Sequence, residues 1–281
     1  MIKIAHLYYD LLNLYGDDGN LKAITYCLDK LNIEYSLDKI TINDEFDLLS
    51  YDFIYVGSGT EKNLYLAIND IKKYESQIRQ YIDDNKIFLA TGNALDMFGK
   101  FIDSFSGEKI DTLDIFNFFS KEENKRNVGE VMFAMGSIKP LIGFLNNTFS
   151  IEEETVKNYS NLFEIYKSIG YTITKNAEGV TKNNFYGTHI IGPILVRNPE
   201  ILRYFVSRLI QEKNIELEDS ITKIDTEFEL KARDEFIITK NNGKVIIIKT
   251  KNQRSYANFR ITSFFIYYKD VVYTFELLID I

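Results

Sequence analysis

The chain has 281 residues, of which 45% are hydrophobic, with a net charge of −8 and a single cysteine. The acidic balance argues against a general nucleic-acid or anionic-membrane surface, and one cysteine excludes intrachain disulfides and thiolate zinc sites. The length allows a sizeable core, in one large domain or in one domain with a small annex. The N-terminus has no apolar signal-peptide region and no apolar run reaches membrane-spanning length, so we expect a cytoplasmic protein.

The N-terminal part of the chain alternates strand and helix patterns. Residues 2–8 and 53–56 are short and apolar, as expected for strands buried in a parallel sheet. Between them apolar residues recur at helical spacing, which places Cys27 on an apolar helix face as a core residue. Residues 64–82 repeat this spacing and predict one amphipathic helix. This alternation is typical of an α/β fold.

The most informative stretch is KIFLATGNALDMFG at residues 86–99. It predicts a buried strand, a corner of small residues and a short helix. A strand, a tight turn and a helix form a nucleophile elbow, which holds one side chain above the carboxyl edge of the sheet. The elbow position here is Gly92, which has no side chain to offer. Thr91 precedes it as an alternative nucleophile, but its side chain would point in another direction.

The middle of the chain is less regular. The charge run at 121–126 predicts a solvated loop, and residues 131–134 and 142–144 predict short strands. A further strand is expected over 180–190, and Pro199 begins a helix, where its missing N–H costs nothing.

The C-terminal part changes character at about residue 236. Phe236–Ile238 and Val245–Ile248 flank Asn241-Asn242-Gly243, which is the pattern of a β-hairpin. Residues 259–268 and 271–281 predict two more strands. We therefore expect a β-meander whose apolar face needs a cover, and we predict that it forms an interface, with self-association favoured over a different partner.

Three segments carry a resemblance to a known family. Residues 89–99 are similar to a Leu-Ala-x-Cys-x-x-x-Gln-x-x-Gly elbow, residues 186–193 to Phe-Gly-Thr-Tyr-Leu-His-Gly-Pro, and residues 10–20 to Asp-Leu-x-Asn-x-Tyr-Gly-Asp-x-Gly-Asn. On these motifs the chain resembles class I glutamine amidotransferases of the cobyric-acid-synthase type. Among them it is most similar to the glutaminase subunit of lipid II isoglutaminyl synthase, which amidates peptidoglycan precursors. The resemblance extends from the start of the chain to about Arg233.

The resemblance also indicates where this chain departs from the family. The family's catalytic cysteine aligns with Gly92 and its catalytic histidine with Ile191, while Asp96 takes the glutamine position and His189 the tyrosine position. Because thiolate attack and imidazole proton transfer carry the glutaminase reaction, both halves of the machinery are expected to be missing. An active glutaminase that uses rewired residues, such as Thr91 or His189, is the less favoured alternative.

Other positions resemble the family's glutamine site. Arg126 begins an Arg-x-x-Gly-Glu element whose arginine binds glutamine in family members, and residues 57–61 stand where the family has a Gly-Gly-Gly-Gln-Asp loop beside the oxyanion hole. We predict that Arg126, Gly59, Asn93 and His189 form a crevice that accepts a small amino acid or carboxylate. Arg126 fits a solvated charge run equally well. We predict no metal and no cofactor.

The expected fold is α/β, with a mostly parallel sheet flanked by helices and a small C-terminal antiparallel β annex. The division that we predict is 1–235 for the amidotransferase-like domain and 236–281 for the annex. The predicted function is a catalytically degraded glutaminase-like subunit that pairs with a Mur-ligase-like ATP-dependent partner. The alternative is a non-enzymatic amino-acid-sensing or scaffolding protein that uses the former glutaminase crevice. We expect neither the subunit nor the sensing protein to bind nucleic acid or a membrane.

Overall fold

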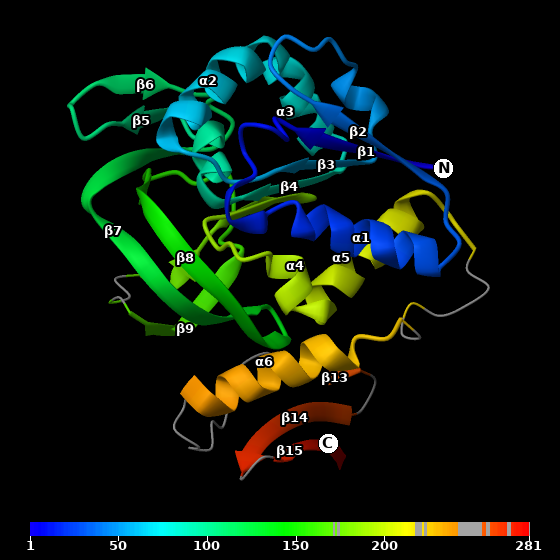
Figure 1. Cartoon of the computed structure of the whole chain (residues 1–281). Helices are drawn as coiled ribbons and strands as arrows, with labels where there is room; N and C mark the ends of the chain where they lie inside the picture. The colour runs from blue at the N-terminus through cyan, green and yellow to red at the C-terminus, as the bar shows by residue number, and fades with distance from the viewer. Residues whose placement is uncertain are drawn as a thin grey trace.

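The computed structural model describes residues 1–170, 172, 175–216, 221, 224–240, 255–256, 259–268 and 271–280. Two six-stranded sheets and their covering helices make up most of it (Figure 1). The helices are α1 (Gly19–Lys30), α2 (Glu61–Ile71), α3 (Glu75–Asp83), α4 (Ile194–Arg197), α5 (Pro199–Glu212) and α6 (Glu227–Lys240). The strands before α4 are β1 (Ile2–Leu7), β2 (Tyr35–Ile40), β3 (Phe53–Val56), β4 (Ile87–Thr91), β5 (Phe101–Asp103), β6 (Lys109–Asp111), β7 (Phe118–Met135), β8 (Ile138–Glu153), β9 (Phe163–Ile169), β10 (Ala177–Glu178), β11 (Val180–Lys182) and β12 (Phe185–Thr188).

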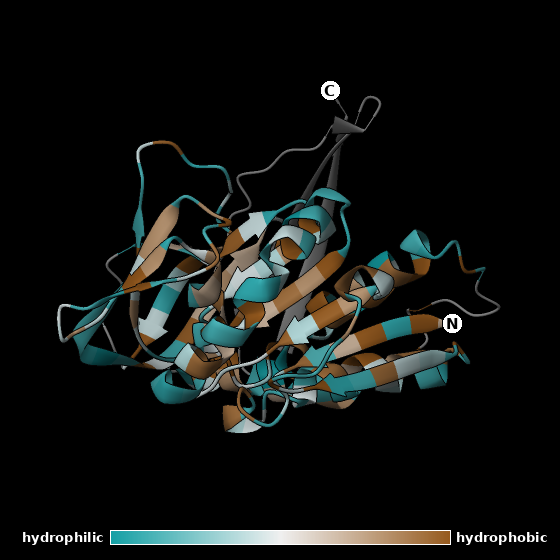
Figure 2. Cartoon of the chain, turned by 90° about the horizontal axis from the view of Figure 1, so that it is seen from above, coloured by the Kyte–Doolittle hydropathy of each residue, from teal (hydrophilic) through white to brown (hydrophobic). Residues whose placement is uncertain are grey.

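The central sheet has the strand order β11-β12-β4-β3-β1-β2. Neighbouring strands run parallel except for β11, which pairs antiparallel with β12. Alternate side chains pack against α1 and α5 on one face and against α2 and α3 on the other, so both faces are buried. Figure 2 shows apolar segments running through the strands at the centre of the molecule. The prediction of a mostly parallel sheet flanked by helices is confirmed.

The second sheet was not foreseen in the sequence. Its strands follow the order β10-β9-β7-β5-β6, and β8 pairs with β7. The predicted strands at 131–134 and 142–144 are confirmed as parts of the long β7 and β8. The charge run at 121–126 was predicted to be a loop, which is wrong, because it lies within β7. Pairing with β8 overrides the local polarity, and a register shift between Glu122 and Asn127 interrupts the ladder there.

Two helix predictions meet different outcomes. Pro199 does begin α5, in the first turn where no N–H is required. The single helix expected over 64–82 is instead α2 and α3, joined by a 3-10 turn at Lys72–Tyr74. Apolar spacing alone does not reveal such a break, because Ile68, Ile71 and Ile78 face the same core on both sides of it.

The predicted strand at Phe236–Ile238 is wrong, because these residues form the last turns of α6. Ile237 packs against Met132 and Ile142 of the second sheet, and Arg233 pairs with Glu200 at 2.5 Å. These tertiary contacts support a helix that three consecutive apolar residues do not specify. The turn at Asn241-Asn242-Gly243 and the run Val245–Ile248 lie outside the described residues.

The annex contains an antiparallel sheet as predicted. Its strands are β13 (Ser255–Tyr256), β14 (Phe259–Tyr268) and β15 (Val271–Asp280), in that order. In Figure 1, α6 lies between β14 and the rest of the molecule. The boundary that we place between residues 235 and 236 falls within α6, and both the two-domain division and self-association through the annex stay predictions.

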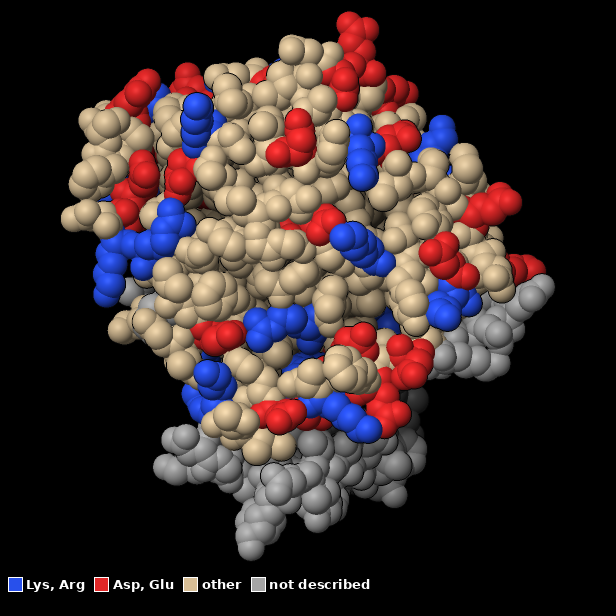
Figure 3. Space-filling model, in the orientation of Figure 1, with Lys and Arg blue, Asp and Glu red and all other residues tan. Residues whose placement is uncertain are grey.

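The surface carries both signs of charge. On the face in Figure 3, acidic and basic side chains are interspersed over the described part of the molecule.

Among the described residues, no helix combines the length and apolar character needed to cross a membrane.

Candidate functional site at the carboxyl edge of the central sheet

The predicted elbow is present at the end of β4. The chain leaves the strand at Thr91, turns through Gly92 with a φ of +62°, and continues in a 3-10 helix over Gly92–Phe98. A positive φ is costly for other residues and suits glycine, which explains how this sharp strand-to-helix corner forms. The corner is buried and lies at the carboxyl end of the central strands, where sites in parallel sheets are built.

The space above Gly92 is occupied by Ser58. A Cβ atom built on Gly92 would lie 2.3 Å from the Cβ of Ser58 and 2.4 Å from its Oγ. It would also lie 3.1 Å from the Cγ2 of Ile191, which is buried. The position that resemblance gives to the nucleophile therefore has no room for a side chain, and the position given to the base holds a hydrocarbon.

The side chain of Asn93 forms hydrogen bonds to the backbone of the loop beside the elbow. Its Oδ1 accepts a hydrogen bond from the N–H of Gly59 at 2.9 Å, and its Nδ2 donates to the carbonyl of Gly59 at 2.9 Å. The hydroxyl of Ser58 also donates to Asn93 Oδ1, at 3.3 Å. The N–H of Gly59 lies in the loop that the resemblance places beside an oxyanion hole. Because this N–H already donates to Asn93, it is not free to stabilise an oxyanion.

Thr91 is part of a buried hydrogen-bond network. Its Oγ1 donates to Asp17 Oδ2 at 3.1 Å and lies 2.8 Å from the hydroxyl of Tyr55. Asp17 Oδ2 also accepts from the N–H of Ser58 at 2.8 Å. Burial raises the pKa of Asp17 to about 6, against the hydrogen bonds that favour its charged form. Because Thr91 is fully buried in this network, its hydroxyl does not face a ligand space.

A crevice of about 250 Å³ opens beside the elbow, and the side chains of Arg126, Asn93 and Glu61 line it together with Gly59. The Arg126 guanidinium pairs with Glu61 at 2.6 Å and donates to Asn146 Oδ1 at 3.2 Å. Burial acts to raise the pKa of Glu61, but hydrogen bonds from its own backbone N–H and from Arg126 outweigh it, so this pKa is lowered. The structure thus brings Arg126, Gly59 and Asn93 together as expected.

His189 does not line this crevice. Its Nε2 lies 3.0 Å from Asp96 Oδ1, and both side chains are buried. The backbone N–H of His189 donates to Glu178 at 2.8 Å. Burial alone would lower the pKa of His189, but Asp96 and Glu178 raise it, so the imidazolium form is favoured. The sequence did not reveal this pair, although both positions depart from the family motif at the same time.

The described residues contain no cluster of three or more His, Cys, Asp or Glu side chains arranged to hold a metal ion. Asp17 Oδ2 accepts from the N–H of Ser58 and from the hydroxyl of Thr91, and its Oδ1 is buried without a hydrogen-bond partner among the described residues.

Comparison with known proteins identifies the family. Residues 3–199 match the family model of the CobB/CobQ-like glutamine amidotransferase domain. The chain belongs to this family. A crystal structure of a glutamine amidotransferase aligns with a TM-score of 0.50 and 14% identity over 73% of this chain and 98% of the other, which supports the fold.

Two relatives have the same assigned role. The chain is 26% identical over 243 residues to the lipid II isoglutaminyl synthase (glutamine-hydrolyzing) subunit GatD of Staphylococcus aureus, covering 86% of this chain and 98% of the relative. It is 27% identical over 217 residues to the subunit of the same name from Streptococcus pneumoniae, covering 75% and 82%. The resemblance inferred from motifs is therefore confirmed at the level of the family and of these relatives.

Proposed function

We propose that this chain is a catalytically inactive, glutaminase-like subunit that supports a Mur-ligase-like, ATP-dependent partner in the amidation of lipid II. The observation that carries the proposal is the filled space above the elbow. A side chain on Gly92 would meet Ser58 at 2.3 Å, and Ile191 stands 3.1 Å away where a base is needed. The elbow backbone is retained without room for a nucleophile.

The chemistry of glutamine hydrolysis needs three things that this site does not offer together. A nucleophile must attack the carboxamide, a base must move its proton, and free N–H groups must hold the oxyanion. At this corner Gly92 lacks a side chain, Ile191 cannot exchange protons, and the N–H of Gly59 is held by Asn93 at 2.9 Å. Binding of a small molecule in the crevice is compatible with all three changes.

The partner is inferred from the relatives. Both GatD proteins are named as subunits of a glutamine-hydrolyzing synthase, and this chain covers 98% and 82% of their lengths. A chain that retains the whole subunit but not its chemistry is expected to retain the docking role. Ammonia would then have to reach the partner from solution.

This proposal is tested with the Mur-ligase-like protein encoded nearest to this gene. The two purified proteins should co-elute from a sizing column, and the complex should amidate lipid II with ammonium chloride but not with glutamine. The partner alone, assayed with ammonium chloride, measures what the complex adds. Separate elution of the two proteins would refute the subunit role, and glutamine-dependent amidation would refute the loss of catalysis.

A second candidate function, amino-acid sensing, is favoured by the Arg126–Glu61 pair in the crevice. A guanidinium holds a carboxylate in two parallel hydrogen bonds, and an adjacent carboxylate holds an ammonium group. Arg126 is now 2.6 Å from Glu61, so a ligand carboxylate has to share the guanidinium with it. This competition predicts weak binding, with a dissociation constant on the order of 1 mM.

Calorimetry with glutamine and glutamate measures that binding. Replacing Arg126 with alanine should weaken it about tenfold or more, because a charge-assisted hydrogen bond is lost. Lys125→Ala is the matched control, since Lys125 is the preceding cation of the same run and is not among the residues that line the crevice. Equal weakening by both substitutions, or no heat at about 10 mM ligand, would contradict the idea.

A further inference from the structure

The central sheet and the second sheet meet beside the elbow, where a network of polar side chains joins them. Asp96 belongs to the 3-10 helix over Gly92–Phe98, called the elbow helix below. It accepts a hydrogen bond from the hydroxyl of Ser120 on β7 at 2.5 Å, and it contacts His189, which follows β12. Glu178 on β10 accepts from the N–H of His189 at 2.8 Å. Side chains from both sheets therefore share one network.

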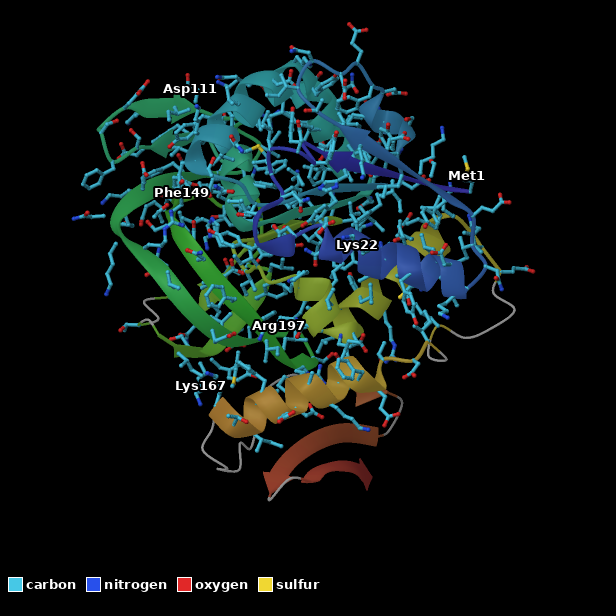
Figure 4. The ribbon with its side chains drawn as sticks, in the orientation of Figure 1. Met1, Lys22, Asp111, Phe149, Lys167 and Arg197 are labelled. Carbon is cyan, nitrogen blue, oxygen red and sulfur yellow. The ribbon has the colours of Figure 1, made fainter. Side chains whose placement is uncertain are left out.

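The centre of this network lies inside the protein. Asp96 and Ser120 are fully buried, and only 7% of His189 is exposed. Phe149 of β8, which Figure 4 labels, belongs to the same hydrophobic core as Phe98 of the elbow helix. Because buried charges are screened less than surface charges, the interaction between Asp96 and His189 depends strongly on their protonation.

The charged pair stands where the family has two neutral residues. By resemblance, the family has glutamine at the position of Asp96 and tyrosine at the position of His189. Neither glutamine nor tyrosine changes its charge near neutral pH, whereas an imidazole does. The two replacements together therefore introduce a group at this junction that responds to pH.

Two carboxyl groups act on the imidazole. Nε2 of His189 lies 3.0 Å from Asp96 Oδ1 and 3.2 Å from its Oδ2, so the protonated ring donates to a charged acceptor. Burial acts to lower the pKa of His189, but Asp96 and then Glu178 raise it, and the raised direction prevails. Burial also raises the pKa of the half-buried Glu178, which favours its neutral form. Asp96 is therefore the main counter-charge of the imidazolium.

The other charged side chains on this side of His189 come from β7, β8 and the segment before β10, and they border a neighbouring cavity. They are Glu123, Glu152, Glu153 and Lys175. All four are at least partly exposed, so solvent screens them from the ring. His189 borders the same cavity, which gives its proton a path of exchange with solvent.

We propose that protonated His189 holds the elbow helix against the second sheet, and that loss of its proton as the pH rises loosens this junction. The neutral ring still donates to Asp96 in one tautomer, but the attraction between opposite charges is lost. Asp96 then remains a buried charge whose main partner is the hydroxyl of Ser120. The inference concerns the junction of the two sheets and does not depend on the proposed function.

The direction of the pH dependence follows from the raised pKa of His189. Below its ordinary value of 6.5, the imidazole is protonated in the folded and the unfolded chain alike, so the full stabilisation is present. This stabilisation is lost as the pH rises through the pKa of the folded state. Burial raises the pKa of Asp17 to about 6, so the contribution of Asp17 is lost at lower pH.

Nitrogen-15 labelling of histidine measures the proton directly, because the chain contains 2 histidines, His6 and His189. Burial lowers the pKa of His6 to about 4, so only His189 should titrate above 6.5. Asp96→Asn keeps the shape of the side chain, removes its charge, and should lower the His189 midpoint by about one pH unit or more. A midpoint below 6.5 in the unaltered protein, or the same midpoint in Asp96→Asn, would overturn the proposal.

Urea unfolding measures the stabilisation. Between pH 6.5 and the His189 midpoint, the equilibrium constant for unfolding should rise by up to about tenfold per pH unit. The double variant Asp96→Asn with His189→Gln should lose this rise, because it holds no proton there. His6→Gln is the matched control and should keep the rise, since His6 is already neutral in this range. An equal rise in the double variant would contradict the proposal.

Amide hydrogen exchange locates the loosening. The N–H of His189 donates to Glu178 at the junction, and the N–H of Phe88 donates to the carbonyl of Asn184 at the other end of β4, at 3.0 Å. After correction for the intrinsic exchange rate, protection of the His189 N–H should fall relative to that of Phe88 as the pH passes the His189 midpoint. Equal loss of protection at both amides would mean that the whole fold loosens, and would overturn the role of the junction.

Discussion

Glutamine incubated with the purified protein should release no more ammonia than the buffer blank. Removing the nucleophile of a catalytic triad lowers turnover on the order of 10⁶-fold, and here Gly92 stands in its place. The rate should then lie below detection in a coupled assay that follows ammonia through glutamate dehydrogenase. A competent glutaminase in the same buffer is the positive control. Turnover that Thr91→Val or His189→Ala abolishes would contradict this expectation and identify substitute machinery.

The same assay can test whether packing blocks the reaction. Gly92→Cys with Ile191→His supplies a thiol and an imidazole but leaves Ser58 in their space, where a Cβ would meet it at 2.3 Å. Adding Ser58→Gly removes that obstacle. We expect turnover in the triple variant to exceed that of the double variant at least about tenfold, but to stay far below that of a competent glutaminase, because Asn93 still holds the N–H of Gly59. Equal turnover in both would mean that Ser58 does not limit the site.

The central fold could be predicted because its signals are local. The buried strands β3 and β4 are short apolar runs, and α1 and α5 repeat apolar residues at helical spacing. The residues of each segment are therefore enough to predict its secondary structure. The full extent of strand β7 could not be predicted from its own residues. Within its charge run, Lys121 and Glu122 pair with β8, and the pairing resumes at Asn127 after a register shift. The residue types at 121–126 do not predict this pairing.

Some residues of the candidate site were also predictable from the sequence, and others were not. Gly59 and Asn93 were expected together because the family resemblance places the loop at 57–61 beside the elbow, and they do meet. Ser58 was missed because a single loop residue gives no hint that it fills the space of another side chain. His189 was predicted to line the crevice, but β12 ends at Thr188 and the imidazole contacts Asp96 instead. The pairing of His189 with Asp96 is visible only in the three-dimensional structure.

Replacing Gly92 with alanine should lower the free energy of unfolding by about 3 kcal/mol or more, through a steric and a conformational cost. The steric cost comes from Ser58, whose Cβ would be 2.3 Å from the new methyl group. The conformational cost comes from the φ of +62°. Gly136→Ala isolates the second cost, because Gly136 has a φ of +59° and no atom within 4 Å of an added Cβ. Urea unfolding of both variants measures the difference.

A double-mutant cycle with Ser58→Gly then assigns the steric part. The single change Ser58→Gly should cost about 1 kcal/mol, since it removes the hydrogen bond to Asn93 and adds a flexible residue. Combined with Gly92→Ala it should recover about 2 kcal/mol, because residues in contact couple by that order. Combined with Gly136→Ala it should recover nothing. If Gly92→Ala costs no more than Gly136→Ala, the space above the elbow is open and the packing argument for an inactive site fails. If the predicted coupling is found, Ser58 and Gly92 act as one unit, and restoring a nucleophile there requires both to change.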